Sequence, residues 1–147
     1  MIRECRSCGA KNRVPIARLD ETPRCGRCKG SLGPVRAPIP IESEQDFEAL
    51  VASSSRPVLV DFWAAWCGPC RALAPELEAL AARRAGELVV AKLDTEAVPS
   101  VAARFAIRSI PTLVLFRRGA EAARLSGAMP AAEIERRLGL SPSRAAP

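Results

Sequence analysis

Six cysteines, arranged in three Cys-x-x-Cys pairs, constrain this 147-residue chain more than any other feature of its sequence. The pairs are Cys5 and Cys8, Cys25 and Cys28, and Cys67 and Cys70. The chain contains no histidine, which excludes Ser-His-Asp triads, Cys-His proteases and every metal site with a histidine ligand. Cysteine is therefore the only nucleophile with strong local context, and the three pairs largely decide what the chain can do.

The first two pairs have the spacing of a zinc-binding module. Sixteen residues separate Cys8 from Cys25, which fits the C-x2-C-x15–20-C-x2-C pattern. Residues 1–36 hold few apolar side chains, and a segment below ~40 residues generally needs a metal or disulfides to hold its shape. We therefore predict a separate module at 1–36 that binds one structural zinc ion through Cys5, Cys8, Cys25 and Cys28. Paired disulfides and a second catalytic dithiol are the alternatives for these four cysteines.

The rest of the chain alternates between helical and apolar stretches. The prolines of residues 37–41 favour extended backbone and a linker that ends in an edge strand. The pattern predicts one α/β domain at residues 42–140, whose central strands are covered on both faces. It predicts a disordered tail at 141–147. Helices are predicted at 43–53, 70–84, 98–106 and 130–140, buried strands at 57–64 and 87–94, and a hairpin of strands at 112–118 and 121–127.

Cys67 and Cys70 stand where a predicted buried strand leads into a helix, in "VDFWAAWCGPCRAL". Unpaired N–H groups and the helix dipole favour an anion at this position, so we expect the pKa of Cys67 to be lowered. Cys70 lies three residues later and within reach, and Pro69 suits the first turn of a helix. A zinc half-site is the alternative, but it would need two further ligands. The pattern therefore favours a dithiol that is oxidised and reduced.

This segment resembles the active site of the thioredoxin family, whose motif appears here as "WCGPC" over residues 66–70. The similarity extends to Asp61 in the preceding strand, to "RSIPTLVLF" around Pro111, and to Gly119 and Gly127. The N-terminal cysteines resemble the zinc-binding extension of the bacterial thioredoxin 2 branch. The resemblance implies a thioredoxin fold, which is a central mixed sheet with helices on both faces, preceded by a small four-cysteine module similar to a zinc ribbon.

The resemblance also implies a role for individual residues. Cys67 would be the attacking thiolate and Cys70 the resolving thiol. Asp61 would be the buried carboxylate that takes the Cys70 proton, with a pKa raised by burial, and Lys92 the lysine near it. The residues implied to line the substrate groove are Trp66, Gly68, Pro69, Ile110 and Pro111, the last after a cis peptide bond.

The function implied is that of a protein-disulfide reductase that is recharged by a thioredoxin reductase and acts on disulfide-containing proteins. It needs one structural zinc ion and no organic cofactor. The N-terminus has no apolar signal region and no apolar run approaches ~20 residues, so we expect a cytoplasmic monomer without membrane association. A function as an oxidant or isomerase is less favoured, because such a protein would work in an oxidising compartment and would need an export signal.

A binding module is the main alternative function. Residues 1–40 hold nine Lys/Arg and three Asp/Glu, which accounts for the whole net charge of +6. Such a basic module could grip nucleic acid or a protein, with the redox chemistry secondary. It has no aromatic residue to stack on bases, so we do not expect nucleic acid as a partner. A further hypothesis is that the zinc module releases its metal when its thiolates are oxidised.

Overall fold

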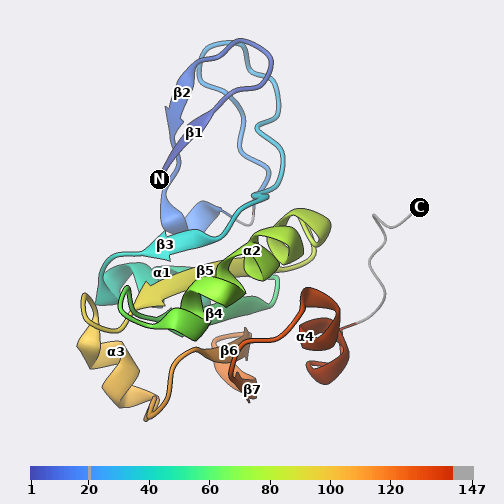
Figure 1. The fold of residues 1–147 in the computed structure, drawn as a ribbon. Helices are drawn as coiled ribbons and strands as arrows, with labels where there is room; N and C mark the ends of the chain where they lie inside the picture. Colours follow the sequence, from blue (N-terminus) through green and yellow to red (C-terminus); the bar gives the residue numbers. More distant parts are fainter. Residues whose placement is uncertain (20, 141–147) are drawn as a thin grey trace.

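The computed structural model describes residues 1–19 and 21–140 and centres on a five-stranded mixed sheet (Figure 1). The strand order is β3-β5-β4-β6-β7; the first three strands are parallel, and β6 and β7 are antiparallel to their neighbours. The predicted tail at 141–147 lies outside the described residues. The elements are β1 (Ile2–Glu4), β2 (Lys11–Arg13), η1 (Ile16–Arg18), β3 (Ile39–Ile41), α1 (Glu44–Ser53), β4 (Val58–Trp63), α2 (Gly68–Arg83), β5 (Val89–Asp94), α3 (Pro99–Arg104), β6 (Thr112–Arg117), β7 (Ala120–Ser126) and α4 (Ala131–Arg137).

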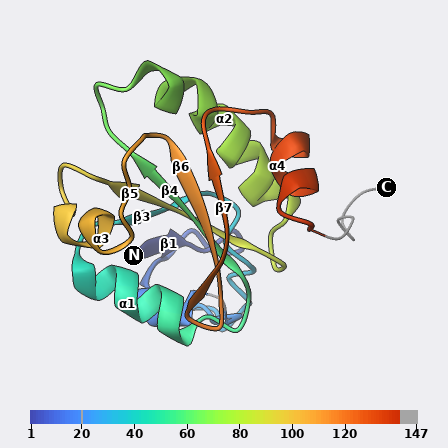
Figure 2. The same ribbon diagram turned by 90° about the horizontal axis from the view of Figure 1, so that it is seen from below.

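Helices cover both faces of this sheet, as predicted. Figure 2 shows α1 and α3 on one side of the strands and α2 and α4 on the other. Because side chains alternate along a strand, β4 contributes to two cores. Val60 and Phe62 pack in the cluster that includes α1, whereas Leu59 packs in the cluster that includes α2 and α4. Among the described residues, no helix is long and apolar enough to cross a membrane.

Local signals in the sequence account for several element boundaries. Ser43 caps α1, and its hydroxyl accepts the Asp46 backbone N–H at 3.1 Å. The Asp46 carboxylate in turn accepts the N–H of Glu42, one residue before the position that a full capping box uses. The β6–β7 hairpin turns at Arg118 and Gly119, whose φ angles of 52° and 81° lie in the left-handed region that suits glycine.

The N-terminal segment shares its hydrophobic core with the rest of the chain. Its β1–β2 hairpin projects beyond the sheet (Figure 1), but Val14 and Leu19 are buried in the same cluster as Phe47 and Leu50 of α1. Ile16, Leu32 and Val35 pack against this cluster. The few apolar residues that the sequence shows in this segment therefore complete the core beside α1. The division of the chain after residue 36 stays a prediction, and apolar contacts cross it.

Candidate functional site

Cys67 and Cys70 lie at the junction between β4 and α2, as their sequence context predicts. Cys67 is the N-cap of α2, and its Sγ accepts the backbone N–H of Cys70 at 3.2 Å. The two Cα atoms are 5.3 Å apart and the sulfurs are at disulfide distance, so the structure shows the oxidised pair. Both cysteines are buried in this state, while Gly68 and Pro69 between them are exposed. The N–H group and the helix N-terminus together favour negative charge on Cys67.

The loop before β6 lies against this disulfide. The Ile110–Pro111 peptide bond is cis, as the resemblance implies. The Ile110 carbonyl oxygen lies 3.7 Å from Cys67 Sγ, so the loop and the start of α2 meet at the reactive sulfur. On the other side, the Trp66 side chain is 67% exposed and donates its indole N–H to a Glu96 carboxylate oxygen at 3.1 Å. An exposed indole held in one orientation offers a firm contact surface next to the dithiol.

Asp61 is a buried acid on the α2 side of the sheet. Its side chain is 0% exposed, and neither carboxylate oxygen has a hydrogen-bond partner among the described residues. Burial raises its pKa from 3.8 to about 7, although the nearby charge of Lys92 acts to lower it. Lys92 stands directly opposite Asp61 in the parallel β4–β5 register, with its Nζ 4.6 Å from the centre of the Trp63 ring. This carboxyl group can therefore exchange a proton near neutral pH.

The four N-terminal cysteines converge as the spacing predicts. All four sulfurs lie within 4.8 Å of one another. Cys5 and Cys28 approach to 3.6 Å, as do Cys8 and Cys25. Tetrahedral zinc with Zn–S bonds of ~2.3 Å sets its sulfur ligands about 3.8 Å apart, whereas a disulfide requires about 2.05 Å. The donor set thus fits one tetrahedral metal ion, and these thiols are free of disulfides.

Hydrogen bonds orient these sulfurs. Backbone N–H groups of Arg27 and Gly30 donate to the sulfurs of Cys25 and Cys28, each at 3.4 Å. Backbone N–H groups around Cys25 lower its pKa to about 6, which favours the thiolate that a metal needs. Asn12 donates its Nδ2 to the Cys25 sulfur at 3.6 Å and accepts the Gly26 N–H at 2.9 Å. It therefore ties the β2 strand to the second cysteine loop.

The sequence did not predict a contact or a role for Asn12 or Glu96. Asn12 precedes the second cysteine pair by thirteen residues, and Glu96 follows Trp66 by thirty. No local motif connects positions so far apart, because their contact arises only when the hairpin and the sheet have formed. The contact between the main-chain carbonyl of Ile110 and Cys67 could not be predicted either, because it does not depend on the type of side chain at position 110.

Comparison with known proteins identifies both parts of the chain. A family model described as thioredoxin matches residues 38–139. The chain belongs to the thioredoxin family. A second model, described as thioredoxin 2, N-terminal, matches residues 4–30, which contain all four clustered cysteines. Relatives in this family are thiol-disulfide oxidoreductases, and this chain is one too. Cys67 and Cys70 lie in its active-site region, and a metal-binding zinc-ribbon module precedes them.

Three relatives illustrate the match. Thioredoxin C-3 of Corynebacterium nephridii is 48% identical over 136 residues, covering 92% of this chain and 91% of that protein. Thioredoxin of Mycobacterium tuberculosis strain H37Rv is 49% identical over 96 residues, covering 65% of this chain and 83% of that protein. The bifunctional thioredoxin reductase/thioredoxin of Mycobacterium leprae is 47% identical over 96 residues, covering 65% of this chain and 21% of that protein. Membership of this family implies a reductase and disulfide-containing proteins as partners.

Proposed function

We propose that Cys67 and Cys70 reduce disulfides in partner proteins and are themselves reduced by a thioredoxin reductase. The observation that carries the proposal is the Cys67–Cys70 disulfide at the N-terminus of α2, against the Ile110–Pro111 loop. The Mycobacterium leprae relative, whose name joins a thioredoxin reductase to a thioredoxin, supports the choice of reductant.

The reaction begins on Cys67. In the reduced chain its thiolate attacks one sulfur of the substrate disulfide, the substrate S–S bond breaks, and a mixed disulfide forms. The first substrate sulfur leaves as a thiolate and takes a proton from solvent. The helix N-terminus and the Cys70 N–H stabilise the attacking thiolate, because both present positive partial charge to Cys67 Sγ.

Cys70 completes the transfer. Asp61 accepts the proton of the Cys70 thiol, and the resulting thiolate attacks the sulfur of Cys67. The mixed disulfide breaks, the second substrate sulfur leaves and is protonated, and the Cys67–Cys70 disulfide closes, so that two electrons and two protons reach the substrate. A pKa of about 7 suits Asp61 to this exchange, and the charge of Lys92 tunes that value.

Substrate docks on the surface around Cys67. Trp66 and Pro69 are exposed there, and Ile110 is partly exposed beside the buried Pro111. We assign the binding of an extended substrate segment to these residues together with Gly68, which is exposed beside Cys67.

The metal in the N-terminal module is zinc in this proposal, one ion per chain. Cys5, Cys8, Cys25 and Cys28 would hold it, and it would supply folding energy rather than redox chemistry. The protein would act as a monomer in the cytoplasm, where thiols stay reduced, without nucleic acid or membrane as a partner.

Insulin reduction tests the catalytic assignment. Wild type should catalyse insulin precipitation with a thiol reductant, Cys67→Ser should be inactive, and Cys70→Ser should accumulate a mixed disulfide. The matched control Ala72→Ser, on the exposed side of the same helix, should behave as wild type. Equal rates for wild type and Cys67→Ser would refute the proposal.

Metal and thiol titration tests the division between the two cysteine sets. Elemental analysis of the reduced chain should find one zinc ion, and a thiol reagent should titrate two cysteines rapidly. Six rapidly titrated thiols in the metal-loaded chain would contradict the assignment of four cysteines to zinc.

A further inference from the structure

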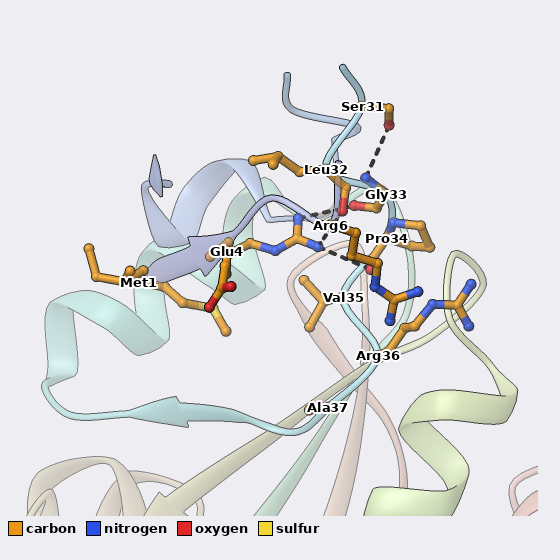
Figure 3. A pocket seen from close by; sticks show the side chains of 12 residues that line it. Met1, Glu4, Arg6, Ser31, Leu32, Gly33, Pro34, Val35, Arg36 and Ala37 are labelled. Carbon is orange, nitrogen blue, oxygen red and sulfur yellow. Dashed lines mark hydrogen bonds between the residues drawn. The ribbon is translucent and has the colours of Figure 1, made fainter. Parts of the chain in front are cut away.

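A groove runs between β1 and the segment that leads into β3 (Figure 3). Its first part is a cavity of about 410 Å³ lined by residues 1–4, 6 and 31–37. A second cavity of about 330 Å³ extends towards Ile39 and Pro40 of β3, and the acidic residues Glu42 and Asp46 line its far end. Both are lined by Met1 and Ile2, so they adjoin; we call them together the β1 groove. Each volume falls in the range of ~300–1,000 Å³ that is usual for ligand sites.

Exposed apolar side chains line this groove. Trp66, Met1 and Ile2 are the large hydrophobic residues exposed in the described part of the chain, and Trp66 belongs to the dithiol site. Met1 is 43% and Ile2 56% exposed. The partly buried Leu32 and Val35 continue the apolar lining on the opposite wall. Apolar exposure within a concave site suggests contact with a ligand.

The β1 strand presents an unpaired edge. Met1 exchanges backbone hydrogen bonds with Val14, and Cys5 donates its N–H to Ala10, so these residues direct their main-chain groups at the β2 side. Backbone groups alternate in direction along an antiparallel strand, so the N–H and C=O groups of Ile2 and Glu4 point to the other edge. Within residues 1–19 and 21–140, no strand pairs with that edge. Such an edge can accept an added strand.

One end of the groove is positively charged. Arg6 and Arg36 extend together on the Pro34 side of the cavity, and neither has a carboxylate partner in the described chain (Figure 3). Arg3 donates to the carbonyl oxygens of Leu32, Gly33 and Pro34 at 3.0 to 3.2 Å, which fixes that wall in place. The Glu4 side chain lies on the Met1 side, away from the other two guanidinium groups (Figure 3).

We propose that the β1 groove binds an extended acidic peptide segment of a partner protein. The peptide adds a strand to β1 through the main chain of Ile2 and Glu4. An apolar side chain of the peptide contacts Met1 and Ile2, and its carboxylates pair with Arg6 and Arg36. Guanidinium groups suit carboxylates because they offer paired N–H donors. Nucleic acid fits less well, because residues 1–37 contain no aromatic side chain on which a base could stack.

This groove is separate from the dithiol. Its lining residue Pro34 lies beside the loop after α2, where a Cβ added to Gly86 would stand 3.8 Å from the Pro34 Cβ. Cys67 caps the opposite end of this 16-residue helix, about 24 Å away at 1.5 Å per residue. The inference therefore goes beyond the reductase activity and assigns a second binding surface.

Fluorescence anisotropy on the full-length, zinc-loaded chain tests the proposal. The probe is a fluorescein-labelled seven-residue peptide with a central leucine-valine pair and three glutamates. Wild type should bind it saturably, and Arg6→Gln/Arg36→Gln should raise the Kd about tenfold, because two charge pairs are lost. A peptide in which glutamine replaces each glutamate should bind wild type with a Kd that is raised by a similar factor. N-methylation of alternate peptide nitrogens should also weaken binding, because it removes strand pairing.

Two controls separate this surface from general charge and from catalysis. Arg117→Gln/Arg136→Gln removes the same charge from exposed positions outside the groove and should leave the Kd unchanged. Cys67→Ser should bind the peptide as wild type does, so the readout stands even if the redox proposal fails.

The proposal is overturned if wild type does not bind the peptide at millimolar concentration, or if Arg6→Gln/Arg36→Gln binds it equally well. An unchanged Kd for the N-methylated peptide would overturn strand addition. Binding of a ten-residue oligothymidine or inorganic pyrophosphate that depends on Arg6 and Arg36, without peptide binding, would reassign the groove to phosphate ligands and reject a peptide partner.

Discussion

At the scale of single residues, the burial of Asp61 raises its pKa and lowers the stability of the folded chain at neutral pH. The carboxyl group is wholly buried and has no hydrogen-bond partner within residues 1–19 and 21–140, so the folded chain disfavours its charged form. The same burial places the pKa at about 7, where proton transfer is useful. An apolar residue at this position of β4 would avoid this cost, but it would remove the carboxyl group that we propose as proton acceptor for Cys70.

The pH dependence of stability should report this cost. Because the folded-state pKa of Asp61 is raised from 3.8 to about 7, its contribution is most favourable below pH 4 and is lost as the pH rises through 7. The loss amounts to about 4 kcal/mol at ~1.4 kcal/mol per pH unit. Asp61→Asn cannot ionise at this position, so it should lack this pH-dependent loss. The free energy of unfolding of Asp61→Asn, relative to that of oxidised wild type, should therefore increase between pH 4 and pH 8.

Urea unfolding at several pH values measures the effect. Glu78→Gln, which neutralises an exposed carboxylate on α2, is the control and should give a curve parallel to that of wild type. Parallel curves for Asp61→Asn and wild type would show that burial does not control the protonation of this acid.

Asn12 is the second residue with an effect beyond its own strand. It touches the sulfur of Cys25 and the backbone of Gly26, so it orients one ligand of the metal module. Partners that hydrogen-bond to a metal ligand typically contribute 10–100-fold to metal affinity. Asn12→Ala should therefore lose its metal to a competing chelator when the chelator concentration is at least about tenfold lower than wild type requires. Lys11→Ala, at an exposed neighbouring position, should match wild type, and equal retention in Asn12→Ala would deny Asn12 this role.

At the scale of elements, a buried ion network joins α2 to α4. Arg84 directly follows α2 and is buried, and its Nε donates to Glu135 of α4 at 2.9 Å. Arg83 pairs with the other oxygen of the same carboxylate. The network anchors α4 over the core on the α2 side of the sheet.

Breaking this network should be costly. Arg84→Met leaves the largely buried Glu135 carboxylate poorly compensated, and we expect a loss of about 3 kcal/mol in the free energy of unfolding. Arg136→Met removes a guanidinium that is 75% exposed and forms a long ion pair, 3.9 Å, with Glu133. Its effect on the free energy of unfolding should therefore stay below about 0.5 kcal/mol. Urea denaturation of both variants makes the comparison. Similar losses would mean that burial adds nothing to the Arg84 pair.

At the scale of the whole molecule, the metal module and the thioredoxin domain are mechanically linked. Val14 and Leu19 lie in one cluster with Phe47 and Leu50. We therefore expect loss of the four-cysteine cluster to expose apolar surface of α1. Metal binding should therefore stabilise more of the chain than the residues that hold the ion.

Metal removal should destabilise the chain as a unit. Treatment with a strong chelator under reducing conditions should lower the midpoint of the main thermal transition by at least about 5 °C. Hydrogen exchange in α1 should rise in the same sample, while exchange in α4, on the other face, should change less. A main transition that is unchanged after metal loss would show that the two parts fold independently.

The sequence by itself determined the local chemistry of this protein. A strand, a cysteine pair and a helix occur in order around Cys67, and the spacing of the other four cysteines predicts one metal cluster. The alternation of elements predicts a sheet covered on both faces. These features can be predicted from the sequence because each depends on residues a few positions apart, through helix periodicity, capping and strand alternation.

Only the tertiary structure decided the long-range pairings. Lys92 lies opposite Asp61 in the sheet, Trp66 hydrogen-bonds to Glu96, and Arg84 hydrogen-bonds to Glu135. The apolar residues of the N-terminal segment pack in the core beside α1. Such contacts join positions 30 to about 50 residues apart, and many partners satisfy the same local preferences. The choice among them follows from how the strands are ordered and how the buried surfaces fit, which is a property of the folded chain.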